Sequence, residues 1–343
     1  SLSNLLRRIT TIQYNRRTCL RMISTRPLIG LLWLLPIQFL ATAFAAFSKK
    51  AIVVTGANKG QGFALCQRIL EEHSDTYVFL CARDLRKGAA ALVELGPYAD
   101  RACTIVLDVT DRESVRDAAR KISERLGDGK LYGCVSNAGI LWGKSLEQQF
   151  QVNARGVRGV LDAFLPLMDS TKGRMVVVSS GLGPLMHSYA SDDNKLIMNN
   201  NELEWEDLEA LMQFCLSAVE LEGGLEEGFS GGPFAEAAPD FHKYGLAKMM
   251  ADAYMKSLGR KHPELQINSC DPGLVYTDLI LNMPKYEGKS IDECSGAQTP
   301  KQGVEAAMRL LFDNDIRGSG HFYAMSKDKS RLLKSTINVK PTE

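Results

Sequence analysis

A tyrosine and a lysine four positions apart form a pair that could transfer protons. Tyr244 and Lys248 lie in the segment Tyr-Gly-Leu-Ala-Lys, within a helical pattern that covers residues 243–261. Residues at i and i+4 share one face of a helix, so the phenol and the ammonium would be neighbours. The ammonium favours the ionised phenol, which predicts that the pKa of Tyr244 lies below its ordinary value of about 10. The same spacing also occurs by chance, so the pair gains meaning only beside other motifs.

A glycine-rich loop earlier in the chain could hold a pyrophosphate. The segment Thr-Gly-Ala-Asn-Lys-Gly-Gln-Gly (55–62) follows an apolar run and opens a helical pattern. Glycines permit a tight turn there and let a phosphate approach the positive end of the helix. An ordinary glycine-rich turn is the alternative, but the place between strand and helix favours dinucleotide binding. The residues assigned to the cofactor in this loop are Gly56, Asn58, Lys59, Gly60 and Gly62.

The ends of the next apolar runs indicate which dinucleotide would bind. Arg83 follows the second run, where an NAD site usually carries an acidic residue for the ribose hydroxyls. Arg83 and Lys59 together favour NADPH, because its 2′-phosphate needs positive charge; the alternative is that Arg83 only caps a surface turn. Asp108 and Val109 close the third run, where adenine would lie. The fourth run closes with Asn137, Ala138 and Gly139, which complete the predicted cofactor site.

These motifs need a frame of strands and helices to bring them together. Short apolar runs with little polar alternation predict seven strands that are buried on both faces, at residues 51–55, 76–82, 102–108, 131–137, 174–180, 265–271 and 320–324. Helical patterns lie between them at 61–72, 111–126, 145–168, 243–261 and 301–312. This alternation predicts an α/β fold of Rossmann type, in which a doubly wound parallel sheet has helices on both faces.

One interval interrupts the alternation before the tyrosine helix. Residues from about 181 to 242 form an insertion with an acidic helical stretch at 202–220. Residues 181–240 hold 13 acidic residues against one lysine. An insertion of this length is longer than an ordinary connection. Its helix could equally be a plain solvated amphipathic helix.

The first fifty residues differ in composition from the rest. Residues 1–27 contain six arginines and no acidic residue, as in an organelle-targeting leader. Residues 28–47 carry no charge and are long enough to cross a bilayer as a helix. We expect a transmembrane anchor at 28–47, with a buried core helix or a cleaved signal peptide as alternatives. The expected location is the mitochondrial inner membrane, with the endoplasmic reticulum second, and the catalytic domain would occupy residues 48–343.

Composition excludes several other classes of protein. The 343 residues have a net charge of +1, and 45% of them are hydrophobic, which is typical of a globular protein and not of a disordered one. The eight cysteines show no metal-ligand spacing, so no metal site is predicted and the thiols are expected to be reduced and buried. No basic and aromatic stripe suggests nucleic acid.

The motifs together resemble the short-chain dehydrogenase/reductase family over about residues 51–325. TGANKGQG, LDV, SNAG, QVNARGV, VVVSS, YGLAK and DPGLVYTDL stand in the family order. Among its members, the chain looks most like the monomeric carbonyl reductases, which share TGxNKG, the CARD-like strand end and a long insertion before the tyrosine. Gln61 and Ser136 depart slightly from the usual motifs.

This resemblance implies a role for each member of a catalytic tetrad. Tyr244 would be the general acid, and Lys248 would lower its pKa and bind the nicotinamide ribose. Ser180 would hydrogen-bond the substrate oxygen, and Asn153 would hold a water that links Lys248 to solvent. The resemblance also implies that the carboxamide of the nicotinamide is flanked by Pro272, Gly273, Val275 and Thr277.

The function expected from these features is NADPH-dependent reduction of a ketone, aldehyde or quinone to an alcohol by a membrane-anchored enzyme. The alternative is a non-catalytic or weakly active accessory subunit of a respiratory-type membrane complex, with NADPH bound structurally. In shorter family members the tyrosine helix forms the subunit interface. The insertion should cover that surface and leave the soluble domain monomeric.

Overall fold

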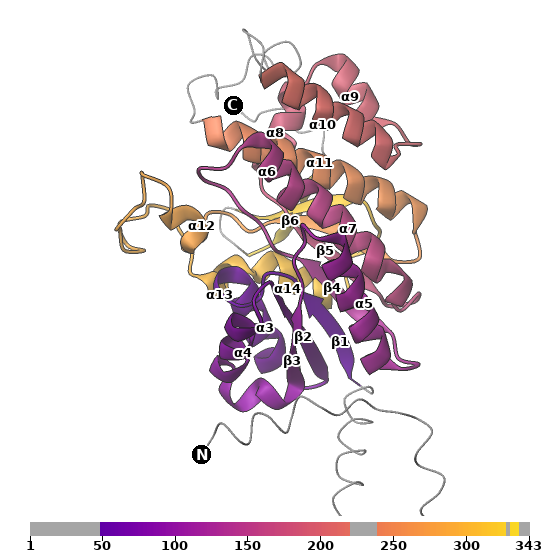
Figure 1. Cartoon of the computed structure of the whole chain (residues 1–343), viewed down its shortest axis with the longest axis vertical. Coiled ribbons are helices and arrows are strands. Elements are labelled where there is room, and N and C mark those ends of the chain that lie inside the picture. Colours follow the sequence, from indigo (N-terminus) through magenta and orange to yellow (C-terminus); the bar gives the residue numbers. More distant parts are fainter. Residues whose placement is uncertain (1–48, 220–238, 327–329, 336–343) are drawn as a thin grey trace, which may run out of the picture. The chain divides into compact units, whose positions relative to one another are not determined.

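The computed structural model describes residues 49–219, 239–326 and 330–335, which contain a single sheet flanked by helices (Figure 1). Its strands are β1 (Lys50–Val54), β2 (Thr76–Ala82), β3 (Ala102–Val106), β4 (Leu131–Ser136), β5 (Arg174–Val178), β6 (Gln266–Asp271), β7 (His321–Met325) and β8 (Leu332–Ser335). Their order across the sheet is β3-β2-β1-β4-β5-β6-β7-β8, and β1 to β7 pair in parallel. The chain therefore winds outward from β1 in both directions, as predicted for a Rossmann-type sheet.

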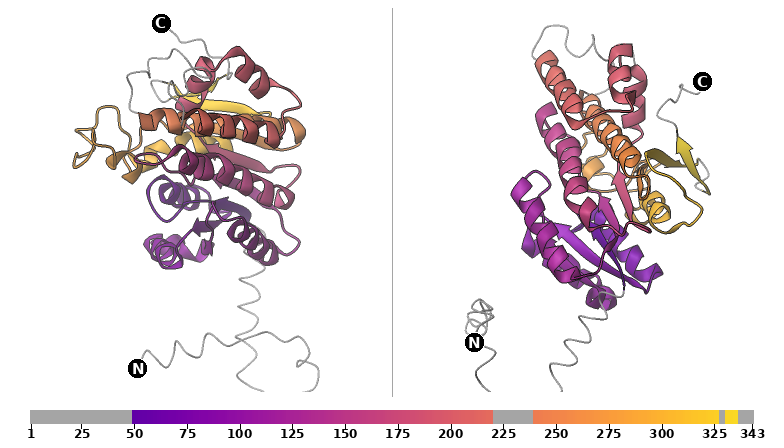
Figure 2. Two further views of the ribbon diagram at one scale, coloured as in Figure 1. Left: turned by 45° about the horizontal axis from the view of Figure 1, so that its top comes forward. Right: turned by 90° about the vertical axis from the view of Figure 1, so that its right-hand side faces the viewer.

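Helices cover both faces of this sheet (Figure 2). One face is covered by α3 (Gly60–Glu72), α4 (Leu85–Glu94) and α14 (Glu305–Phe312). The other face is covered by α5 (Arg112–Leu126), α7 (Gly156–Phe164) and α11 (Pro239–Lys261). The other helical elements in the described ranges are η1 (Gly96–Arg101), α6 (Leu146–Phe150), η2 (Gln151–Arg155), η3 (Leu165–Leu167), α8 (Leu182–Tyr189), α9 (Asp192–Asn199), α10 (Trp205–Val219), α12 (Asp278–Leu281) and α13 (Pro300–Gly303).

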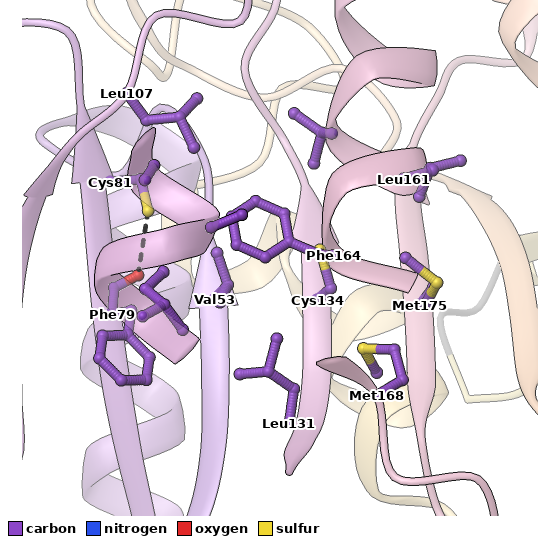
Figure 3. Packing of buried hydrophobic residues seen from close by; sticks show 14 of the residues in the cluster. Val53, Phe79, Cys81, Leu107, Leu131, Cys134, Leu161, Phe164, Met168 and Met175 are labelled. Carbon is purple, nitrogen blue, oxygen red and sulfur yellow. Dashed lines mark hydrogen bonds between the residues drawn. The ribbon is translucent and has the colours of Figure 1, made fainter. Parts of the chain in front are cut away.

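Each central strand sends alternate side chains into two apolar cores. In β1, Val53 packs toward α5, α7 and α11, whereas Ile52 packs toward α3 and α14. Figure 3 shows the first core, where the ring of Phe164 from α7 lies among side chains of the strands, including Cys134 of β4. Because both faces are buried, the strands have no polar alternation, which explains their continuous apolar runs. The seven cysteines in the described ranges are buried and unpaired, as expected.

The predicted number of strands was wrong by one. The eighth strand, β8, pairs antiparallel with β7 at the edge of the sheet, with Tyr323 opposite Lys334. Its four residues, Leu-Leu-Lys-Ser, are too short to form a recognisable apolar run. The structure also places helix α4 after β2, in a segment that the sequence reading left unassigned.

The predicted insertion is an excursion of helices between β5 and α11. It contains α8, α9 and α10, and its acidic helix α10 spans Trp205–Val219, close to the predicted 202–220. The apolar face of α10 packs against α11 and α6 through Leu208, Leu211, Met212 and Cys215. The insertion therefore covers one flank of the helix that carries Tyr244. Residues 220–238 of the predicted insertion lie outside the described residues.

The expected leader (1–27) and transmembrane anchor (28–47) also lie outside the described residues. Within the ranges that are described, no helix has the length and apolar character needed to cross a membrane.

Candidate active site

A large cavity opens where the carboxyl ends of the central strands meet. Its volume is about 630 Å³, and it extends from the loop after β1 to the segment after β6. Every residue that the sequence analysis assigned to the cofactor or to catalysis lines this cavity, with the single exception of Asn153. Parallel strands place their carboxyl ends at one edge of the sheet, which explains how motifs so distant in sequence come together.

The glycine loop forms a cradle that only glycine can build. Gly56 and Gly60 have φ angles of +63° and +57°, in the left-handed region that other residues avoid. A Cβ atom on Gly62 would lie 2.4 Å from the Gly56 carbonyl oxygen and 2.5 Å from Asn137 Nδ2. The N-terminus of α3 behind this loop has no side-chain cap, which leaves main-chain N–H groups for an anion. The cradle therefore fits the pyrophosphate of a dinucleotide.

The end of β4 holds this loop in place. The Thr55 hydroxyl accepts hydrogen bonds from the main-chain N–H groups of Asn137 (2.9 Å) and Ala138 (3.1 Å). In return, Asn137 Nδ2 donates to the Thr55 carbonyl at 2.9 Å. A Cβ atom on Gly56 would lie 2.9 Å from the Ala138 Cα. Asn137 and Ala138 thus support the cradle as well as lining the cavity.

The end of the cavity beside β2 and β3, where adenosine is expected, carries one exposed cation that forms no ion pair in the described ranges. Arg83 follows β2 and lines the cavity, while the next residue, Asp84, caps α4 by accepting from the Arg86 and Lys87 N–H groups. The capping role proposed as an alternative for Arg83 therefore falls to Asp84. Lys59 differs from expectation, because its ammonium already pairs with the carboxylate of Asp278 across the cavity.

Asp108 and Val109 line the same end of the cavity. The Asp108 carboxylate accepts from the main-chain N–H and the hydroxyl of Thr110, at 2.9 and 2.7 Å. These bonds fix the loop after β3.

The opposite end of the cavity holds the predicted catalytic residues. Tyr244 and Lys248 lie on α11 with only 7% and 3% of their surface exposed. Lys248 Nζ donates to the Val178 carbonyl at 2.7 Å and lies 5.4 Å from the centre of the Tyr244 ring. The Ser180 hydroxyl lines the cavity and accepts from the Leu182 N–H at 3.2 Å. Tyrosine, lysine and serine thus face one space.

Asn153 lies behind this group and not in the cavity. It is fully buried in the π-helical turn η2, where its side chain binds the main-chain N–H and carbonyl of Ile140 at 3.1 and 2.8 Å. Gly139 separates it from Lys248: a Cβ there would lie 3.0 Å from Asn153 Oδ1 and 3.9 Å from Lys248 Nζ. Asn153 therefore braces the loop beside Lys248, and its expected water stays a prediction.

The pKa of Tyr244 shifts in the direction opposite to the prediction. Burial raises the pKa of the Tyr244 phenol above its ordinary value, and the carboxylates of Asp271 and Asp252 raise it further. Burial also lowers the pKa of the Lys248 ammonium to about 8. The helical spacing correctly predicted the neighbours, but the ammonium donates to a main-chain carbonyl and both groups are withdrawn from water. At neutral pH the phenol therefore keeps its proton.

The segment after β6 closes the cavity over this end. Pro272, Gly273, Val275 and Thr277 all line it, and their expected place beside the nicotinamide carboxamide stays a prediction. Gly273 has a φ angle of +74°, and Gln298 Nε2 donates to the Pro272 carbonyl at 3.1 Å. Tyr244 here contacts an apolar cluster with Leu141, Ile280 and Met283.

Two carboxylates near Lys248 were not predicted from the sequence: Asp252 is buried, and Asp271 is partly buried. Asp252 lies one helical turn further along α11, where its carboxylate accepts from the Ser179 hydroxyl at 2.8 Å and burial raises its pKa to about 7. Asp271 ends β6 and lines the cavity. The i+4 spacing from Lys248 could have revealed Asp252, and the position before Pro272-Gly273 could have revealed Asp271.

Comparisons with known proteins show what this chain is similar to. The family model described as short chain dehydrogenase matches residues 50–191. Short-chain dehydrogenase/reductase 1 of Saponaria officinalis is 28% identical over 319 residues, which cover 84% of this chain and 97% of that protein. The (+)-neomenthol dehydrogenase of Arabidopsis thaliana is 27% identical and covers 79% and 95% of the two chains.

Solved structures show the same fold. Salutaridine reductase from Papaver somniferum superposes with a TM-score of 0.65 at 24% identity, over 80% of this chain and 99% of that one. The NADPH-bound carbonyl reductase from chicken fatty liver gives a TM-score of 0.56 at 19% identity, over 80% and 96%. The family model identifies residues 50–191 as a short-chain dehydrogenase segment, and members of the short-chain dehydrogenase/reductase family bind a nicotinamide cofactor.

Proposed function

We propose that this protein reduces the carbonyl group of a ketone, aldehyde or quinone to an alcohol with NADPH. The observation that carries the proposal is the buried Tyr244 phenol, which keeps its proton and faces the same cavity as the glycine cradle. Similar proteins support the reaction class, since they carry the names of dehydrogenases and reductases, such as (−)-isopiperitenone reductase of Mentha piperita.

The proposed roles follow from the position of each side chain. A bound nicotinamide cofactor supplies a hydride to the carbonyl carbon. The Tyr244 hydroxyl donates its proton to the carbonyl oxygen, and the Ser180 hydroxyl donates a hydrogen bond to the same oxygen. Lys248 holds the ribose and places a positive charge beside the phenol. The apolar cluster of Leu141, Ile280 and Met283 excludes water and favours a substrate with an apolar body.

Arg83 supports NADPH over NADH. Its guanidinium is exposed at the adenosine end, and Asp84, the nearest acidic residue in sequence, is engaged in capping α4. A guanidinium can bind a phosphate through two parallel hydrogen bonds.

The test is steady-state oxidation of NADPH by the full chain with a panel of quinones, ketones and aldehydes. Turnover with at least one carbonyl substrate is expected. Tight binding of NADPH without any turnover would contradict the proposal and favour the accessory subunit of a membrane complex.

We also propose, from sequence alone, that residues 28–47 anchor the protein in the mitochondrial inner membrane. Fractionation of cells followed by alkaline carbonate extraction tests this. The protein should stay in the mitochondrial membrane pellet, whereas release into the supernatant would contradict an anchor.

A further inference from the structure

A partly buried carboxylate that lines the cavity joins two of its turns. Asp271 Oδ1 accepts from the Gly273 N–H at 2.9 Å, and the Gly181 N–H also donates to this carboxylate. The fit at Gly181 is close, because a Cβ there would lie 2.9 Å from Asp271 Oδ2. Gly181 directly follows Ser180, whereas Gly273 belongs to the segment after β6. Asp271 thus holds the turn of the predicted substrate-binding serine against the turn that closes the cavity.

The sheet already places these turns side by side. Val178 of β5 pairs with Cys270 of β6, and the Ser179 N–H donates to the Cys270 carbonyl at 2.8 Å. The backbone therefore sets the distance between the turns without the Asp271 side chain. Holding the two turns together does not by itself explain why a carboxylate stands here, since withdrawing an unpaired charge from water is costly.

The charge of Asp271 has no ion-pair partner in the described residues. The nearest cation on α11, Lys248, donates to the Val178 carbonyl instead. Burial raises the pKa of the Asp271 carboxyl, whereas its main-chain N–H donors and the charge of Lys248 lower that pKa. When ionised, the carboxylate places a negative charge at the cavity, and this charge raises the pKa of the Tyr244 phenol.

Carbonyl reduction creates a positive charge close to this carboxylate. The proposed reaction would send a hydride to the carbonyl carbon and the Tyr244 proton to its oxygen, which would leave the nicotinamide ring positively charged and the phenol negatively charged until it regains a proton from solvent. A nicotinamide cofactor bound here would act on the carbon of the carbonyl group, while the Tyr244 hydroxyl would act on its oxygen. Asp271 lines the same end of the cavity. A negative charge in this site of low dielectric attracts the ring only in its oxidised form.

We propose that Asp271 favours the reductive direction, because a negative charge on its carboxylate would attract the nicotinamide ring more strongly in the oxidised form than in the reduced form. This inference rests on the proposed function. It concerns the charge of Asp271 and not only its contribution to the shape of the turn.

The test compares the binding of NADP⁺ and NADPH to the full chain by fluorescence titration. Asp271→Asn removes the charge, so NADP⁺ should lose about tenfold more affinity than NADPH does. Asp169→Asn is the matched control. The Asp169 carboxylate likewise accepts a hydrogen bond from the main-chain N–H two residues later, that of Thr171, at 2.8 Å. Asp169 precedes β5, so it lies at the amino ends of the strands and away from the cavity. This control should leave the ratio of the two affinities unchanged.

An equal loss of affinity for both dinucleotides in Asp271→Asn would overturn the proposal, since it would mean that the side chain only shapes the turn. Asp271→Glu gives a second measurement if the first variant fails to fold. It keeps the charge, so the ratio should stay within about twofold of the parent, and a shift of about tenfold would overturn the proposal. Failure of the proposed function would be visible separately, as a parent protein that reduces no carbonyl substrate.

Discussion

The phenol of Tyr244 and the ammonium of Lys248 share a buried face of α11, and burial acts on the two groups in opposite directions. It raises the pKa of the phenol and lowers that of the ammonium. The spacing in sequence predicts that they are neighbours, but it contains no information on their exposure. Burial depends on α8, α10 and the loops that surround α11 in space. The direction of these two pKa shifts could therefore be obtained only from the fold.

The pH dependence of turnover should report Lys248. Since its pKa is lowered to about 8, the ammonium is charged below that pH and loses its proton as the pH rises through it. Loss of the cation weakens its support of the ribose and of the phenol. We therefore expect kcat/KM for NADPH to fall above about pH 8, measured in initial-rate profiles. A profile that stays level to the ordinary lysine range near pH 10.4 would contradict this account.

Arg83 should determine the choice of cofactor more than Lys59 does. Charge-assisted hydrogen bonds contribute about 1.5–3 kcal/mol, so Arg83→Ala should reduce the preference for NADPH over NADH about tenfold or more. Lys59→Ala should have a smaller effect, because Asp278 already neutralises that ammonium. Titration of each variant with both dinucleotides measures the ratio. An unchanged ratio in Arg83→Ala would contradict the assignment.

Among the elements, the seven parallel strands were predictable because each is buried on both faces and reads as a dense apolar run. Two kinds of element were not. The strand β8 is short and lies at the edge, and α4 is a ten-residue helix that depends on the Asp84 cap. The glycine loop was predicted with its neighbours, because its conformation demands glycine at fixed positions. The exclusion of Asn153 from the cavity was not, since η2 turns its side chain toward Ile140.

Two glycine variants test whether the glycine loop forms the binding site for NADPH. Gly62→Ala should abolish measurable NADPH binding, because the new Cβ would collide with the Gly56 carbonyl oxygen and the Asn137 amide. Gly159→Ala on α7 is the control, since a Cβ there meets nothing within 4 Å. It should bind NADPH normally and gain up to about 1 kcal/mol in stability, as expected for alanine within a helix. Normal NADPH binding by Gly62→Ala would show that the loop does not form the cradle.

At the scale of the molecule, the insertion covers a surface of the domain that could otherwise contact a second subunit. The apolar side of α10 is packed against α11 and α6, so this flank of the tyrosine helix is not available to a second subunit. We expect a fragment of residues 48–343 to be monomeric in solution. Light scattering over a range of concentrations measures this. A dimer that persists at low concentration would mean that association uses another surface.

The most direct test of the central claim is the comparison of turnover and NADPH binding in Tyr244→Phe. This change removes the hydroxyl and leaves the buried ring in place, so the fold and the glycine cradle should be intact. General acid catalysis typically contributes about 10²- to 10⁴-fold, and we predict that turnover falls by at least that lower factor while NADPH binding persists. A Tyr244→Phe variant that reduces carbonyl substrates as fast as the parent would contradict the account.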